Sequence, residues 1–269
     1  MTHETGASGR ARLAVEVSGS GAPVLMIHAG VTDRRSWSPL IDHLGSAIRS
    51  IRYDTRGFGE TEYDPEDGWS PVSDAVEVLD AEAVDASIVI GCSMGGRAAI
   101  DLTLAHPDRV GALVLIAPSI GGAPAPDLAP LVADLDRRID AADDRGDLDE
   151  VNRLQAEVWL DGPGHAGRAT PGARALFLEM NRRALAAADP GDPAPIKAAW
   201  PRLAAITVPT LVLVGDLDLA HMGRNARHVA ASVRDAELVE LSDVAHLPHL
   251  EGHPETLQAI ARFVAAHAG

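Results

Sequence analysis

The sequence has little of three residue types, and each shortage excludes a class of protein. Among 269 residues there is one cysteine, Cys92, so the chain can form neither an internal disulfide nor a site built from several thiolates. Lys197 is the only lysine, and the formal net charge is −16, which argues against the basic face that nucleic-acid binding requires. Aromatic residues make up 3% of the chain, which favours an aliphatic binding pocket.

Long hydrophobic runs are also missing. The longest apolar stretches, such as residues 112–118, fall far below the roughly 18 residues that a membrane-spanning helix needs. The first residues contain no basic cluster followed by an apolar run, so we expect no signal peptide. Together with the lone cysteine, these absences favour a cytoplasmic protein without a membrane or nucleic-acid partner.

The chain does contain an alternation of strand-like and helix-like segments. Segments typical of strands occur at residues 13–17, 23–28, 48–54, 87–92 and 110–117. Segments with helical spacing of apolar residues lie at 36–47, 72–84 and 94–105. This alternation predicts a parallel sheet that is covered on both faces by helices, an α/β fold.

The pattern changes after residue 117. Up to residue 200 the chain is rich in Gly, Pro, Asp and Ala, with helical stretches near 128–142, 149–159 and 174–187 and no convincing strand. Strand-like segments resume at 210–215 and 237–241, and an amphipathic helix over 255–267 follows. We therefore expect a core of residues 1–117 and 201–269, with a helical cap of residues 118–200 inserted over the carboxyl edge of the sheet, where open α/β sheets bind ligands.

The strongest local signal is the segment Gly91-Cys92-Ser93-Met94-Gly95-Gly96, which joins the strand at 87–92 to the helix at 94–105. A G-x-S-x-G motif between a strand and a helix is typical of a nucleophile elbow, a sharp turn that exposes the serine hydroxyl above the sheet. The alternative is a tight turn in which Ser93 caps the helix. We expect Ser93 to be a nucleophile.

A serine nucleophile needs a base, commonly a histidine oriented by a carboxylate. Asp216 and Asp218 follow the strand at 210–215, and His246 follows the strand at 237–241. The chain order Ser93, Asp218, His246 is the order that this kind of fold uses. Asp218 is the expected acid, and Asp216 is the alternative.

Two further histidines follow His246. His246, His249 and His253 resemble a metal triplet, but Pro248 breaks the helical spacing and no set of thiolates and carboxylates accompanies them. We therefore expect no metal site, with His249 in a loop and His253 at the start of the last helix.

An acyl-transfer site also needs two backbone N–H donors for the developing oxyanion. One is expected from Met94, directly after the serine. The other is expected from the loop after residues 23–28, where Gly30 is the first candidate and Val31 the second.

Taken together, these segments resemble the α/β-hydrolase superfamily, in the capped group of serine hydrolases that includes enol-lactonases, carbon–carbon bond hydrolases, esterases and cofactor-free haloperoxidases. The resemblance covers nearly the whole chain outside the cap and rests on His28–Gly30, Asp54–Gly59, Gly91–Gly96, Gly215–Asp218 and Ala245-His246. It implies a mostly parallel sheet of seven or eight strands with helices on both faces and a helical cap. Ala29 departs from the glycine that is usual after His28, and the short polar N-terminus leaves the first strand open.

The resemblance implies a function as well. Ser93, Asp218 and His246 would hydrolyse a carboxylic ester or lactone of a small organic molecule through an acyl-serine, without a cofactor. Two alternatives stay open: cleavage of a carbon–carbon bond in a ring-fission diketone, and a weakly catalytic ligand-binding protein with a hydrolase fold. The oligomeric state is not encoded in any pattern that we find.

Overall fold

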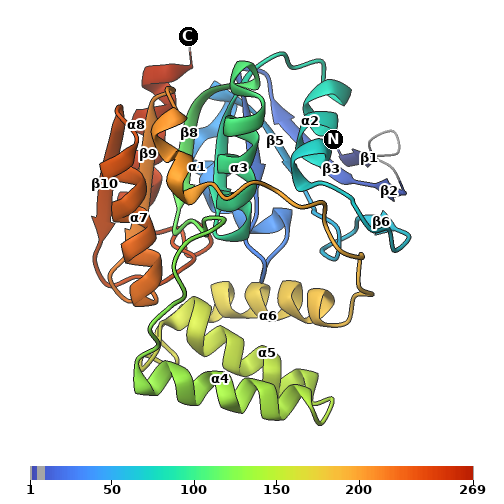
Figure 1. Ribbon diagram of the computed structural model, residues 1–269, viewed down its shortest axis with the longest axis vertical. Helices are drawn as coiled ribbons and strands as arrows, with labels where there is room; N and C mark the ends of the chain where they lie inside the picture. The colour runs from blue at the N-terminus through green and yellow to red at the C-terminus, as the bar shows by residue number, and fades with distance from the viewer. Residues whose placement is uncertain (1, 5–9, 269) are drawn as a thin grey trace.

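An eight-stranded sheet lies at the centre of the computed structural model, which describes residues 2–4 and 10–268 (Figure 1). Its strands are, in chain order, β1 (Thr2–Glu4), β3 (Ala14–Gly19), β4 (Ala22–Ile27), β5 (Ile48–Tyr53), β7 (Ser87–Cys92), β8 (Val110–Ile116), β9 (Thr210–Gly215) and β10 (Ala236–Leu241). The spatial order is β1-β3-β5-β4-β7-β8-β9-β10, with antiparallel pairing at β1–β3 and β3–β5 and parallel pairing elsewhere. Two short strands, β2 (Ala11–Arg12) and β6 (Glu62–Tyr63), form a separate ribbon. The predicted mostly parallel sheet is confirmed, and its eighth strand is β1.

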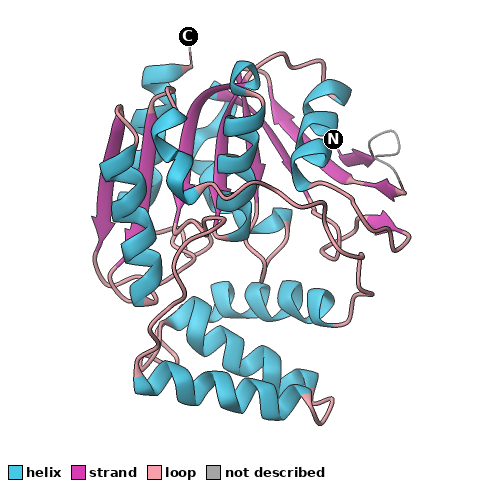
Figure 2. Ribbon diagram, in the orientation of Figure 1, coloured by secondary structure: helices cyan, strands magenta, loops and turns pink. Residues whose placement is uncertain are grey.

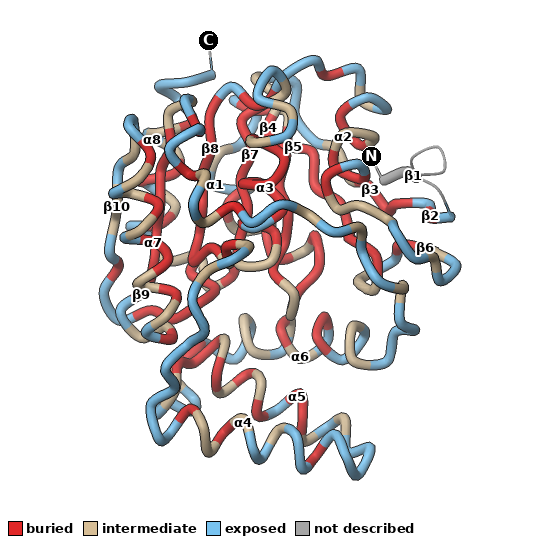
Figure 3. The backbone as a smooth tube through the Cα atoms, in the orientation of Figure 1, coloured by how far each residue is buried: buried red, intermediate tan, exposed pale blue. Residues whose placement is uncertain are grey.

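The central strands are buried on both faces (Figure 3). β7 and β9 are buried at every position, as expected for short runs of aliphatic and β-branched residues in a parallel sheet. β10, at the edge, remains partly exposed along most of its length. The sheet therefore offers a rigid platform whose carboxyl edge carries the loops after β4, β7, β9 and β10.

Helices cover both faces of this platform (Figure 2). α1 (Ser38–Leu44) and α8 (Pro254–His267) pack together on one face, and α2 (Pro71–Ala81), α3 (Met94–Ala105) and α7 (Ala220–Ser232) lie on the other. α2 begins where the sequence dictates, because Ser70 accepts a hydrogen bond from the Ser73 amide and Pro71 occupies the first helical position. Short 3₁₀ turns are η1 (Arg34–Trp37), η2 (Gly45–Ala47), η3 (Pro107–Arg109) and η5 (Trp200–Ala205).

Three further helices form a separate layer beyond the edge where the parallel strands end (Figure 1). They are α4 (Pro130–Asp143), α5 (Leu148–Ala156) and α6 (Pro171–Leu185), and a π-helical turn, η4 (Glu157–Asp161), follows α5. These cap-like helices correspond to the three helical stretches predicted between residues 118 and 200. None of the helices in the described part of the chain combines the length and the apolar character needed to cross a bilayer.

His249 lies in the turn between β10 and α8, and it is a core residue rather than a surface one. Its ring is fully buried and stacks on the Trp37 indole, with 4.2 Å between ring centroids. Neither ring nitrogen has a hydrogen-bond partner among the described residues. Burial, with the nearby His246 and His28, lowers the pKa of His249 to about 3, so the folded protein keeps this ring neutral.

This burial makes the stability of the fold depend on pH. The unfolded chain binds a proton on His249 below the ordinary histidine pKa of about 6.5, whereas the folded chain does so only near a pKa of about 3. The contribution of His249 is therefore fully present above the unfolded pKa and falls as the pH drops toward the folded pKa, by up to about 1.4 kcal/mol per pH unit. We expect His249→Leu to reduce the slope of unfolding free energy against pH by this amount between pH 4 and 6, as measured by urea unfolding. The exposed His43 supplies a matched control, His43→Leu; equal slopes in all three proteins would contradict the prediction.

Candidate active site

Ser93 occupies a strained turn between β7 and α3. Its backbone has φ +54° and ψ −113°, a region that non-glycine residues rarely adopt and that costs about 1–3 kcal/mol. Two glycines make the turn possible by their lack of a side chain. A Cβ on Gly91 would lie 2.3 Å from the Gly95 carbonyl oxygen, and one on Gly95 would lie 2.1 Å from the Ile27 carbonyl oxygen.

Hydrogen bonds to both its amide and its carbonyl hold the backbone of Ser93 in place. Its amide donates to the Ile116 carbonyl of β8 at 3.0 Å, and its carbonyl accepts from the amides of Arg97 (3.0 Å) and Ser119 (3.1 Å). The Ser93 side chain makes no capping hydrogen bond to α3, so the alternative of a capping serine is wrong. The first amides of α3 therefore keep their capacity to bind a negatively charged atom.

Asp218 and His246 form a buried acid–base pair. His246 Nδ1 lies 2.8 Å from Asp218 Oδ2, and each side chain is 1% exposed. The other carboxylate oxygen, Oδ1, accepts from the Leu219 amide at 2.7 Å, which fixes the carboxylate plane. With Nδ1 engaged, Nε2 is the nitrogen left to exchange a proton. Asp216, the alternative acid, is exposed to solvent.

The loop that carries His246 packs against the residue before Ser93. Cys92 is fully buried, and its thiol donates to the His246 carbonyl oxygen at 3.7 Å. Burial raises the pKa of the Cys92 thiol well above its ordinary range, so this side chain stays protonated and fills space between the two loops. The structure thus brings the loop of His246 directly beside the turn of Ser93.

The loop after β4 approaches the first turn of α3. A Cβ on Gly30 would lie 3.5 Å from Met94 Sδ, so the two expected oxyanion donors belong to adjacent segments. The buried His28 steadies this loop, since its Nδ1 lies 2.8 Å from the Ala29 carbonyl oxygen and its Nε2 accepts from the Thr55 amide at 3.0 Å. Burial lowers the pKa of His28, which favours the neutral ring that this pairing needs.

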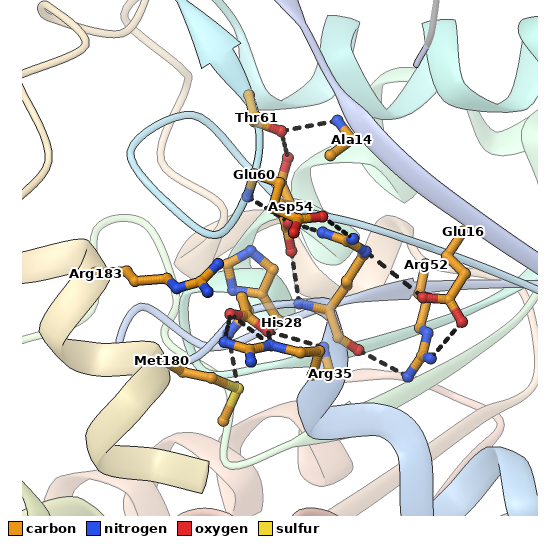
Figure 4. A network of polar contacts seen from close by, with 12 residues as sticks. Ala14, Glu16, His28, Arg35, Arg52, Asp54, Glu60, Thr61, Met180 and Arg183 are labelled. Atoms are coloured by element: carbon orange, nitrogen blue, oxygen red, sulfur yellow. Dashed lines mark hydrogen bonds and ion pairs between the residues drawn. The ribbon is translucent and has the colours of Figure 1, made fainter. Parts of the chain in front are cut away.

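A charged network holds the far end of the same loop (Figure 4). Asp54, at the end of β5, accepts from the backbone amides of Arg34 and Glu60, each at 2.8 Å, and forms an ion pair with the Arg34 guanidinium. Arg34 also forms an ion pair with Glu60. The side chain of Asp54 is fully buried. The Thr61 hydroxyl donates to the backbone carbonyl oxygen of Asp54 at 2.6 Å. The sequence suggests Arg56 as a partner of Asp54, but Arg56 binds Asp74 instead, and the buried partner of Asp54 is Arg34.

The cap-like helices touch the loops of this site. The Trp159 ring, on η4, lies 4.7 Å from the His246 ring between centroids. Gly162, just after η4, packs so closely on the acid loop that a Cβ there would lie 2.6 Å from the Leu217 carbonyl oxygen. Trp159 and Gly162 therefore help to explain why the Asp218–His246 pair is shielded from solvent.

Two ion pairs join the same layer to the core. Arg168 binds Glu251 through both terminal nitrogens, at 2.8 and 2.7 Å, and it also donates to the Leu160 carbonyl at 2.7 Å. On α6, Glu179 accepts from Arg35 at 2.7 Å, next to Met180, whose sulfur accepts from the Asp33 amide at 3.5 Å. In Figure 4 the side chains of Arg35 and Met180 reach into the same region from different segments.

Comparison with known proteins places this site in context. The chain is 25% identical over 264 residues to the pimeloyl-[acyl-carrier protein] methyl ester esterase of Nitrosospira multiformis, a match that covers 95% of this chain and 99% of that protein. It is 38% identical over 107 residues to the 2-hydroxymuconate semialdehyde hydrolase of Pseudomonas sp. (strain CF600), and that match spans 37% of each chain.

The fold and the family are shown by two further comparisons. A thermophilic esterase from Thermogutta terrifontis superposes with a TM-score of 0.80 at 24% identity and covers 100% of both chains, a likeness of fold. The model of the Alpha/beta hydrolase family matches residues 24–260. The chain belongs to the alpha/beta hydrolase family.

Proposed function

We propose that this chain is a serine hydrolase that cleaves a carboxylic ester or lactone of a small organic molecule through an acyl-serine intermediate. The observation that carries the proposal is the strained turn at Ser93 next to the buried Asp218–His246 pair. A serine held in that backbone conformation without a capping role has an unused hydroxyl, and a histidine bonded through Nδ1 has an unused Nε2. The full-length similarity to a methyl ester esterase supports the ester class.

The proposed reaction has two halves. Ser93 Oγ attacks the substrate carbonyl carbon while His246 Nε2 takes its proton, and Asp218 stabilises the imidazolium that forms. The amides of Met94 and Gly30 bind the carbonyl oxygen as it becomes negative. His246 then gives its proton to the leaving alkoxide oxygen, so the alcohol departs and the acyl group stays on Ser93. Water attacks the acyl-serine by the same steps and regenerates the serine.

Burial strengthens the proposed acid–base pair. A carboxylate and an imidazolium interact more strongly where solvent is excluded, and the two side chains are each 1% exposed. Trp159 covers His246 from the side of the cap-like helices. We propose residues 118–200 as the cap of this enzyme, with the core formed by residues 1–117 and 201–269 and the substrate bound between them. Arg168–Glu251 and Arg35–Glu179 would hold the cap in place.

Ser93→Ala tests the nucleophile. We expect hydrolysis of an ester and lactone panel of graded acyl length to fall by a factor on the order of 10⁶, as when the serine of such a triad is removed. Covalent labelling by a serine-directed phosphonate, followed by mass spectrometry, should disappear as well. Circular dichroism and the melting temperature serve as folding controls. Retained turnover in a folded variant would refute the proposed mechanism.

Asp218→Asn tests the acid and separates it from its neighbour. The amide cannot stabilise the imidazolium and favours the wrong tautomer of His246, so we expect kcat to fall by about 10³- to 10⁴-fold with little change in KM. Asp216→Asn is the matched control, because Asp216 lies two residues away and is exposed. If the two variants lost activity equally, the assignment of Asp218 would be wrong.

One observation favours a second candidate function. The 38% identity to a 2-hydroxymuconate semialdehyde hydrolase, although confined to 107 residues, points to carbon–carbon bond cleavage in a ring-fission product. The same three side chains would then move protons on the substrate before the bond breaks. The products decide: carboxylic acid and alcohol from the ester panel support the first function, and turnover confined to a vinylogous diketone supports the second.

A further inference from the structure

A cavity of about 250 Å³ lies between α2, α3 and the segment 193–196, which runs from α6 back to η5. Its lining does not include Ser93, Asp218 or His246. The wall is mainly apolar, with Ile27, Trp69, Pro71, Met94, Ala98 and Ile196 as its principal members. Met94 and Gly95 also contribute, so the cavity lies against the first turn of the helix that begins after Ser93.

The outer wall of the cavity is fixed by hydrogen bonds. The Ala194 amide donates to the Trp69 carbonyl at 2.7 Å, and the Gly68 amide donates to the Asp192 carbonyl at 2.8 Å. The Trp69 indole nitrogen donates to the Gly191 carbonyl at 2.8 Å. The segment over the cavity is therefore held against the loop before α2, and the space beneath it is a built feature of the fold.

Two residues of the cavity lining carry a polar atom that is buried without a partner. Tyr53 is 0% exposed and Asp101 is 4% exposed, and both residues line the cavity. Neither the Tyr53 hydroxyl nor Asp101 Oδ1 makes a hydrogen bond to any described residue. Buried polar atoms in folded proteins almost always have a partner, because an unpaired one loses the hydrogen bonds it made to water. Both residues belong to the lining of the same cavity, which favours an occupant with a hydrogen-bonding group.

The charges of the wall select a neutral occupant. Arg56 already holds Asp74 through two hydrogen bonds of 3.0 Å, and Arg97 lies 3.7 Å from Asp101 Oδ2. Burial raises the pKa of both Tyr53 and Asp101, and the Asp74 charge adds to the effect on Tyr53. A second charge in this space would meet cations that are already paired and an apolar wall, whereas a hydroxyl group can donate to Asp101 Oδ1 and can donate to or accept from the Tyr53 hydroxyl.

We propose that this cavity is a second ligand site, which binds a small, neutral, mainly apolar molecule whose hydroxyl group hydrogen-bonds to Tyr53 or Asp101. The site is separate from the proposed acyl-transfer centre, and it stands whether or not Ser93 is a nucleophile. Its occupant contacts Met94 and Gly95 from the side of α2, behind the turn that presents Ser93.

Binding of 4-fluorophenol to the full chain tests the proposal, with fluorobenzene as the matched probe without a hydroxyl. We expect saturable binding of 4-fluorophenol in ¹⁹F NMR titrations, and an affinity roughly two- to tenfold higher than that of fluorobenzene, the gain typical of one net hydrogen bond. A crystal structure with 4-fluorophenol should place the ring in the cavity, with its oxygen within hydrogen-bond distance of Tyr53 or Asp101.

Three variants make the test specific. Tyr53→Phe and Asp101→Asn each change one orphaned group at nearly constant shape, and at least one should remove the preference for 4-fluorophenol while leaving fluorobenzene binding unchanged. Ala98→Phe fills the cavity and should abolish binding of both probes, whereas Ala105→Phe, at an exposed position of the same helix, should not. Ser93→Ala should bind both probes as the wild type does, which separates this site from the proposed active site.

Several results would overturn the proposal. One is a crystal structure in which ordered water alone bonds to Tyr53 and Asp101 while no probe binds at millimolar concentration. Others are binding that persists in a folded Ala98→Phe variant, a probe located at Ser93 instead of in the cavity, and a preference for 4-fluorophenol that survives in both Tyr53→Phe and Asp101→Asn.

Discussion

The strained backbone at Ser93 is the constraint on which the rest of this molecule depends. A residue with a side chain can hold a φ of +54° only where its surroundings leave no other choice. Here the two carbonyl oxygens closest to Gly91 and Gly95 leave no room for a Cβ, and hydrogen bonds from β8, α3 and the segment after β8 hold the peptide on both sides. The packing of β7 between β4 and β8 offsets the free energy that this turn costs. The proposed chemistry at Ser93 therefore depends on the core of the sheet.

Much of the fold could be predicted because its signals are local. The predicted strand at 87–92 and helix at 94–105 have the observed bounds, since a β-branched run, a glycine-rich turn and an uninterrupted helical pattern follow one another. α7 was not predicted. Its buried positions Met222, Ala226 and Val229 have helical spacing, but polar and charged residues on its exposed face hide this stripe from a linear reading. β1, β2 and β6 are two or three residues long, too short for any periodicity to appear.

The candidate site was predicted less completely than the fold. Some of its residues are positioned by their neighbours in the chain, and others by contacts with residues far away in the sequence. The choice of Asp218 over Asp216 rested on position in the loop, and the structure places only Asp218 against His246. The ion pair of Asp54 with Arg34 and the burial of His249 against Trp37 could not be predicted. Both contacts form only when the loop after β4 folds back over neighbouring strands. Such contacts join residues far apart in the chain, and no local pattern encodes them.

The segment that covers the cavity beside α2 and α3 has a practical consequence. Lys197, the single lysine of the chain, is exposed at the end of that segment, one residue after Ile196 in the cavity wall. Apart from the N-terminal amine, a reagent selective for primary amines has one place to attach. A fluorophore installed there would lie next to the cavity wall and three residues before Trp200, without any engineered mutation, so the natural sequence already offers a handle for observing this segment in solution.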